Sequence, residues 1–193
     1  MRLELTNSTA QYSEALGTCE EALSKDFCDR QLEMQIATLQ CRILTYMGKT
    51  PECVARGLEA LSFFKPQLSA LLTDPVASNA YENELLEDIV GLTKEFGINE
   101  SFKRLPVLQD KFLLAAHSLV IEMLAPLAFA APHFIHTMPL IGVLLSLKHG
   151  KCIQSAVHVS KFIACLITSS QCSHIMFRIP IDQERIRNLL SQR

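Results

Sequence analysis

Two stretches of the sequence share one pattern: a helix that ends near a glycine, a short break, and a second helix. The first stretch covers residues 35–66 with its break at Gly48, and the second covers residues 138–167 with its break at Gly150. Antiparallel helix pairs of this kind bury their apolar faces by stacking on neighbouring pairs. The pattern therefore predicts an all-α protein in which helix pairs stack as a short α-solenoid.

Length and composition fit one packed domain. The chain has 193 residues, of which 49% are hydrophobic and 20% are charged, and this balance supplies a core and excludes wholesale disorder. The length accommodates about four helix pairs of roughly 34–47 residues each. We therefore expect residues 1–193 to form a single helical-repeat domain, with sub-blocks at residues 9–66 and 80–170 joined by an irregular, proline-containing segment at residues 66–79.

Helical periodicity dominates the sequence, and no stretch shows the alternation that is typical of strands. Apolar residues at positions i, i+3, i+4 and i+7 predict a first helix that is capped by Ser8 or Thr9. A second helix is expected to end in a left-handed cap at Gly48. Thr50 is expected to cap the third helix, with Pro51 at its first position. Later helices are predicted at residues 81–96, 110–129, 138–148, 151–168 and 182–190.

Charge and cysteine content exclude some classes of protein. The net charge is −2, whereas a nucleic-acid-binding surface needs a basic patch or stripe. The seven cysteines include no Cys-x-x-Cys pair, and residues 1–9 lack the apolar stretch of a signal peptide. Scattered cysteines without a leader are typical of reduced thiols. We therefore expect a cytoplasmic protein that does not bind nucleic acid.

Small residues and a closing proline mark the second helix of the first pair. Ala60 lies within that helix, and Pro66 follows it. In this spacing the pair resembles a tetratricopeptide unit, which keeps a small residue and a proline at these positions. Cys53 and Gly57 depart from the pattern, because the repeat usually has alanine at the first position and an aromatic residue at the second.

Short motifs follow one another in a characteristic order in the second half of the chain. They are LP at 105–106, DK at 110–111, LAPLA at 124–128, PHF at 132–134, SLKHG at 146–150 and SA at 155–156. With the first helix pair, they resemble the tetratricopeptide-like region of very large signalling proteins. Those proteins also contain a Ser/Thr-kinase-like domain, an AAA/STAND-type ATPase, a GAF domain and a sensor histidine kinase. The resemblance covers residues 12–168 and implies a docking or relay piece of such a protein, without its kinase or ATPase activity.

No phosphate-binding loop is predicted. Gly48-Lys49-Thr50 matches the end of such a loop, but the loop also requires a glycine five residues before its Gly-Lys pair. Ile43 occupies that position, and the preceding segment has helical rather than strand character. The sequence therefore predicts no nucleotide site at this turn.

No catalytic group is predicted either. Cys152 and His149 are close in sequence, but they flank the expected turn at Gly150, where a nucleophile and a base need not meet. The acidic clusters at residues 20–21 and 84–88 lie on expected solvated faces, whereas general acid–base catalysis requires a carboxyl group in a desolvated cleft. We therefore expect a protein that is not an enzyme.

Histidines of the second half support an alternative hypothesis, a small helical metal-binding protein or enzyme. His133 and His136 are three residues apart and fit one helix face, and Cys172 and His174 are further potential ligands. Pro132 precedes the first histidine, and no carboxylate lies nearby. Capping or packing roles are therefore the preferred interpretation, and no metal or cofactor is expected.

A membrane-associated helical protein is the third hypothesis. Residues 112–147 are strongly apolar, but Pro126, Pro132 and Pro139 interrupt them. A spanning helix needs about 20 predominantly apolar residues. We therefore expect buried helices and no membrane span.

The apolar belt at residues 124–145 has two interpretations, the core of a helix pair or a docking face for a partner helix. A non-catalytic scaffold for protein–protein interaction or intramolecular signal relay is the preferred function. Its expected partners are another protein, neighbouring repeats of a larger chain, or a second copy of itself, since a solenoid cut in mid-array exposes apolar ends. The candidate docking residues are Phe129, Phe134, Met138, Leu140 and Leu144.

Overall fold

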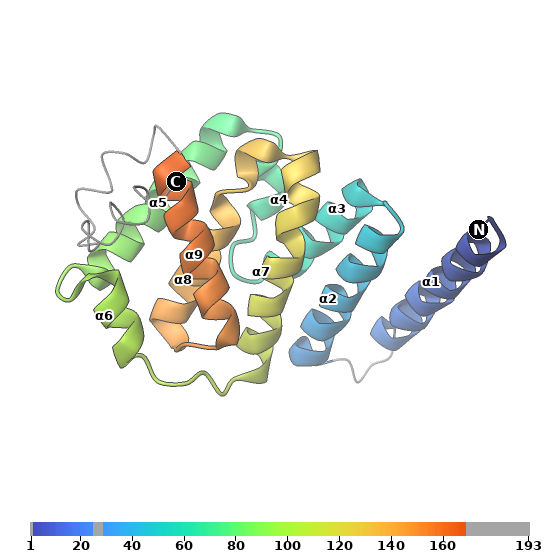
Figure 1. Ribbon diagram of the computed structural model, residues 1–193, viewed down its shortest axis with the longest axis horizontal. Coiled ribbons are helices and arrows are strands. Elements are labelled where there is room, and N and C mark those ends of the chain that lie inside the picture. The colour runs from blue at the N-terminus through green and yellow to red at the C-terminus, as the bar shows by residue number, and fades with distance from the viewer. Residues whose placement is uncertain (1, 25–28, 169–193) are drawn as a thin grey trace.

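The computed structural model describes residues 2–24 and 29–168, and every regular element in these ranges is helical (Figure 1). The all-α prediction is confirmed for this part of the chain. The predicted helix at residues 182–190 lies outside the described residues. The elements are α1 (Arg2–Leu23), α2 (Arg30–Tyr46), α3 (Thr50–Leu61), α4 (Leu68–Leu71), α5 (Pro75–Thr93), α6 (Gly97–Arg104), α7 (Lys111–Ala130), the 3-10 helix η1 (Pro132–Phe134), α8 (Thr137–His149) and α9 (Ile153–Thr168).

The helices do not stack strictly in chain order. α2 and α3 form the first predicted helix pair, and α7 packs across both of them although α4, α5 and α6 intervene in the sequence. On its other side α7 contacts α8, which also packs against α5 and α9 (Figure 1). In a solenoid each unit contacts only its neighbours along the chain. The predicted solenoid arrangement is therefore not confirmed.

One buried apolar cluster extends from α2 through α7 to α9. Leu58 on α3, Met123 on α7 and Phe162 on α9 belong to this cluster, and all three are 0% exposed. Burying a large apolar side chain contributes about 1.5–3 kcal/mol, so this shared core fastens the first helix pair to the later helices. α1 lies at the edge of the molecule and packs on α2 (Figure 1).

The first helix begins before its predicted cap. α1 starts at Arg2, so Ser8 and Thr9 lie inside the helix rather than at its N-cap. Tyr12 nevertheless belongs to the inner face, as the apolar stripe predicts, because it stacks on Tyr46 of α2 with 6.0 Å between ring centroids. This contact helps to hold α1 against the end of α2.

The turn between α2 and α3 confirms one prediction and corrects another. Gly48 adopts a left-handed conformation with φ +70°, as expected for a residue that follows a helix C-terminus. Lys49, not Thr50, is the N-cap of α3, because the Lys49 carbonyl accepts a hydrogen bond from the Cys53 amide at 3.0 Å. Within the described residues no side chain caps this helix. The first turn of α3 thus lacks the usual side-chain support.

The segment at residues 66–79 is not irregular throughout. It contains α4, and α5 begins within it at Pro75. The Asp74 carboxylate accepts hydrogen bonds from the amides of Val76 and Ala77, both at 3.0 Å. An aspartate N-cap followed by proline is a strong helix-start signal, and this signal corrects the predicted boundary.

α7 continues through Pro126, as the predicted helix at residues 110–129 does, so this proline does not interrupt the apolar stretch as the membrane argument expected. Proline inside a helix removes one main-chain hydrogen bond. Pro126 and Leu127 are both buried, and their apolar packing offsets that loss.

Among the described residues, α7 is the one helix long and apolar enough to cross a bilayer, with a mean hydropathy of 1.8 in its most apolar window. Of that window, 44% is buried inside the protein, and core helices of soluble proteins share this length and composition.

Gly142 of α8 is expected to accept no side chain. A Cβ atom there would lie 2.3 Å from Cγ and 2.4 Å from Nδ1 of His158, whose ring is fully buried. Gly142→Ala is therefore expected to lower the free energy of unfolding by about 1–3 kcal/mol, measured by urea denaturation. Gly91→Ala on α5 is the control, since nothing lies within 4 Å of its Cβ position, and it is expected to stabilise by up to about 1 kcal/mol. Equal stability of the two variants would contradict this packing.

Candidate functional site

The predicted docking residues do not form one exposed face. Phe134, Met138 and Leu140 are buried in the core, and Leu144 is partly buried against it. Phe129 alone of the five projects into solvent, with 83% of its surface exposed. The docking interpretation of this belt is therefore corrected, and helix-pair core describes the other four residues.

His133 and His136 have separate partners. His133 Nε2 lies 3.0 Å from the carbonyl oxygen of Leu72, and His136 Nδ1 lies 3.9 Å from Oε1 of Glu82. Burial raises the pKa of the Glu82 carboxyl group, and the nearby His136 opposes this effect. The part of the chain that the structure describes holds no group of three potential metal ligands, and Cys172 and His174 lie outside it.

The other residues considered for chemistry lie on helix surfaces or in turns. Cys152 contacts Ser155, with 3.4 Å between Sγ and Oγ, while His149 is exposed at the end of α8. Residues 20–21 and the acidic side chains of 84–88 are exposed, as predicted. Gly48-Lys49-Thr50 forms the turn into α3, preceded by a helix.

A concavity lies where α2, α7 and the start of α9 meet, and we call it the α2/α7/α9 cleft. It is open to solvent, with a volume of about 570 Å³. Helix α2 forms one wall, α7 and the loop before it form the second, and the first residues of α9 form the third. Its lining residues are Gln35, Thr38, Arg42, Val107, Leu108, Lys111, Leu114, Ala115, Ser118, Cys152, Ile153 and Gln154.

A main-chain clamp holds the rim of this cleft. The Leu108 amide donates to the Lys151 carbonyl, and the Lys151 amide donates to the Pro106 carbonyl, both at 2.8 Å. Glycine is needed at the neighbouring Gly150, which has φ +122°, because a Cβ atom there would lie 2.9 Å from the Pro106 carbonyl oxygen. The clamp thereby fixes the loop before α7 against the start of α9.

Two apolar side chains project from the clamped rim. Val107 is 63% exposed and Ile153 is 86% exposed, and both border the cleft next to the half-buried Leu114. The hydrogen-bonded backbone presents these side chains without a partner among the described residues. They therefore provide apolar contact area in a fixed position.

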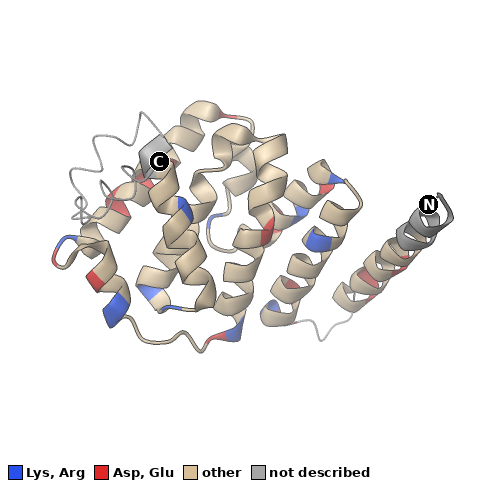
Figure 2. Ribbon diagram, viewed as in Figure 1, with Lys and Arg blue, Asp and Glu red and all other residues tan. Residues whose placement is uncertain are grey.

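Polar and charged groups occupy the walls between the apolar residues. Gln154 Nε2 donates to Ser118 Oγ at 3.2 Å, which ties α9 to α7. Arg42 Nε donates to Glu122 Oε1 at 3.0 Å, and this hydrogen bond raises the pKa of Arg42. Lys111 adds a second cation, and Figure 2 shows basic residues at both ends of the loop between α6 and α7. The cleft thus combines apolar anchor points with positive charge.

Sequence reasoning did not identify this cleft. Val107 belongs to the loop between two predicted helices, and Ile153 follows the predicted break at Gly150. Large apolar residues at helix connections were the available signal, because connections run over the protein surface.

No family model, curated protein or solved structure matches the chain. The described residues form an all-α fold with an open groove.

Proposed function

We propose that the chain is a non-catalytic protein-interaction module that binds a segment of a partner protein in the α2/α7/α9 cleft. The observation that carries the proposal is the pair Val107 and Ile153, which are held exposed on a clamped rim beside a cavity of about 570 Å³. In a larger signalling chain of the kind that the sequence motifs resemble, a neighbouring segment of that chain would take the same place.

The geometry favours a peptide segment as the occupant. Pockets of roughly 300–1,000 Å³ hold a ligand of the size of a small molecule. A few side chains of a partner protein would therefore fill this cleft. Full burial of a valine or isoleucine side chain contributes about 1.5–3 kcal/mol. Because the main-chain clamp already orders the rim, the cleft itself adds little ordering cost, and most of that cost falls on the peptide.

Charge indicates the chemistry of that segment. Arg42 and Lys111 line the cleft as cations, while Glu122 pairs with Arg42 and Asp110 precedes Lys111 at the start of α7. Acidic residues beside apolar anchors are therefore the complementary pattern, because opposite potentials favour encounter and correct register. We expect a partner segment that alternates acidic and large apolar residues.

Selection from a random peptide library tests this proposal. We expect the purified chain to enrich acidic–apolar peptides, and fluorescence anisotropy then gives the Kd of one synthetic example. Ile153→Asp is expected to raise this Kd by at least about ten-fold, because it removes about 1.4 kcal/mol or more of apolar contact. Added salt is also expected to weaken binding by screening Lys111.

Val76→Asp is the matched control. Val76 is 79% exposed on α5 and does not line the cleft, so its replacement is expected to leave the Kd unchanged. Library selection that enriches no peptide, or equal Kd values for the Ile153 and Val76 variants, would contradict binding in this cleft.

A further inference from the structure

Cys41 of α2 and Cys53 of α3 face each other across the first helix pair. The Sγ atom of Cys41 lies 3.5 Å from the carbonyl oxygen of Cys53, and the Sγ atom of Cys53 lies 3.3 Å from the carbonyl oxygen of Cys41. Both residues are 0% exposed. Because each thiol reaches the backbone of the other residue, the two sulfur atoms occupy neighbouring positions between the helices.

The two thiols are chemically unequal. A hydrogen bond from the Cys41 thiol, with a smaller one from the Thr45 hydroxyl at 3.5 Å, lowers the pKa of Cys53 to about 7. The same contact raises the pKa of Cys41. Cys53 also lies in the first turn of α3, where the helix dipole favours a thiolate. Cys53 is therefore the nucleophile, and Cys41 keeps its proton.

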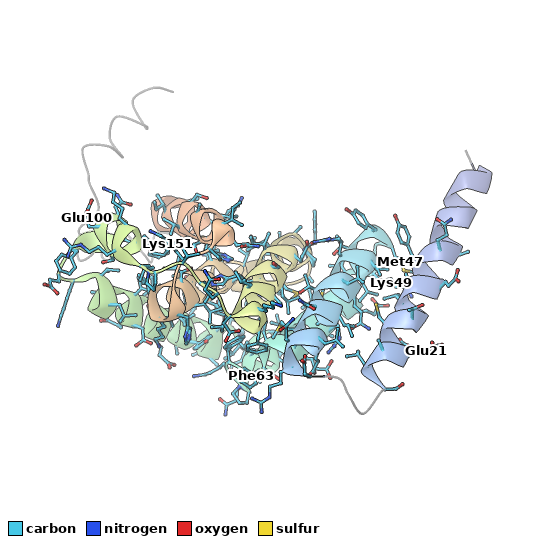
Figure 3. All side chains as sticks on the ribbon, turned by 90° about the horizontal axis from the view of Figure 1, so that it is seen from below. Glu21, Met47, Lys49, Phe63, Glu100 and Lys151 are labelled. Carbon is cyan, nitrogen blue, oxygen red and sulfur yellow. The ribbon has the colours of Figure 1, made fainter. Side chains whose placement is uncertain are left out.

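The position of Cys53 also provides access. The first turn of α3 lacks a side-chain cap, so no cap hydrogen bond opposes its opening, although that opening uncovers the buried Cys53 and Val54. This turn lies at the edge of the molecule facing α1, where Met47 and Lys49 mark it in Figure 3. Because Cys53 is 0% exposed, its reaction with a small neutral oxidant requires such a local opening.

We propose that Cys41 and Cys53 form a modification site at which hydrogen peroxide produces a reversible disulfide between α2 and α3. The Cys53 thiolate attacks one peroxide oxygen, the O–O bond breaks, and the departing hydroxide takes a proton to leave as water. The Cys41 sulfur then attacks the Cys53 sulfenic acid, an S–S bond replaces the S–O bond, and the Cys41 proton leaves in a second water.

The reaction balances without a further reagent. Two thiols and one peroxide become one disulfide and two waters, so the thiols lose two electrons and the peroxide gains them. The hydrogen bond with Cys53, burial and the charge of Cys53 all raise the pKa of Cys41. Conversion of Cys53 to a neutral sulfenic acid removes the last of these causes, which favours the second step. A dithiol reductant reverses the product by exchange. The site stands on this thiol pair alone and does not depend on the proposed function of the cleft.

Peptide mapping of the folded, full-length protein tests the site. After treatment with hydrogen peroxide and non-reducing trypsin digestion, we expect peptide 31–42 to be linked to peptide 50–56, because these fragments carry Cys41 and Cys53 respectively. Dithiothreitol should abolish the link. The oxidised protein should show a Tm about 6–12 °C higher than the reduced protein, because the bond closes a short loop.

Variants separate the two roles. Cys41→Ser, which keeps a hydrogen-bond donor beside Cys53, is expected to leave Cys53 as a sulfenic acid that reacts with dimedone, whereas Cys53→Ala should give no dimedone adduct at residue 41. Cys152→Ala, which alters a half-buried thiol on another element, should leave the link intact. A link that forms only in guanidinium, a Tm that does not rise, or peroxide that converts Cys53 in the wild-type protein to a sulfinic acid without linkage would overturn the proposal.

Discussion

Lowering the pH from 7 to about 4.5 is expected to reduce the free energy of unfolding by an amount on the order of 5 kcal/mol. His117 on α7 and His158 on α9 are responsible. Their ring centroids lie 5.2 Å apart, both residues are 0% exposed, and their ring nitrogens have no well-formed hydrogen bond to any described residue. Neutral imidazoles fit this site, whereas a charged one would lose its solvation.

The direction of the effect follows from the two pKa values. Burial lowers the pKa of His117 to about 4, with a smaller contribution from His149, and lowers the pKa of His158 to about 3, with a smaller contribution from His117. Both return to about 6.5 in the unfolded chain. The unfolded state therefore binds protons first as the pH falls. Stability is fully present above about pH 6.5 and is lost progressively down to about pH 3.

Urea denaturation at several pH values measures this loss. The double variant His117→Phe/His158→Phe removes both titrating groups but keeps two rings of similar size, so its stability should change much less between pH 7 and about 4.5. His149→Gln is the control, because His149 is exposed and its replacement should preserve most of the wild-type loss. An unchanged pH dependence in the double variant would assign the effect to carboxyl groups instead.

Phe134→Ala is expected to lower the free energy of unfolding by about 3–5 kcal/mol. Phe134 is 0% exposed in η1, which packs against α5 and α7, so truncation leaves a cavity where three elements meet. This loss is a large share of the roughly 5–15 kcal/mol that stabilises an ordinary protein. Urea denaturation measures this loss. The free energy of unfolding of Phe134→Leu is expected to lie between those of the alanine variant and the wild type.

Phe129→Ala is the matched control for this prediction. Phe129 lies five positions earlier in the same apolar belt, but it is 83% exposed. Its truncation is expected to change stability by no more than about 0.5 kcal/mol. Similar losses for the two variants would mean that the belt is buried in a different way.

Features that depend on neighbouring residues could be predicted from the sequence. The left-handed conformation of Gly48 follows from its position at the end of an apolar stripe. The start of α7 follows from Asp110, whose carboxylate accepts hydrogen bonds from the amides of Phe112 and Leu113. Asp74 and Pro75 give the same kind of helix-start signal. The segment at residues 66–79 contains a second proline, Pro66, and two prolines so close together favoured the prediction of an irregular segment. Local chemistry thus predicts where helices exist more reliably than where they begin.

Features that depend on distant residues could not be predicted in this way. Periodicity shows that α7 has an apolar face, but not that this face meets α2 and α3 rather than α6. Phe129 and Phe134 belong to the same apolar belt, yet the one at the end of α7 is exposed and the one in η1 is buried. The cleft depends on the contact between Pro106 and Gly150, which no pattern within either segment reveals.

The clamp between the loop before α7 and the start of α9 sets the shape of the cleft through main-chain atoms, whereas side chains form its surface. Its two hydrogen bonds join main-chain atoms of Pro106, Leu108 and Lys151, so they persist when the side chains of Val107 and Ile153 are exchanged. Substitutions at these two positions can therefore retune which segment is recognised while the scaffold keeps its shape. A substitution at Gly150 differs from these, because a Cβ atom there would meet the Pro106 carbonyl oxygen. Any larger residue would therefore push the two backbone segments apart and change the shape of the cleft for every ligand.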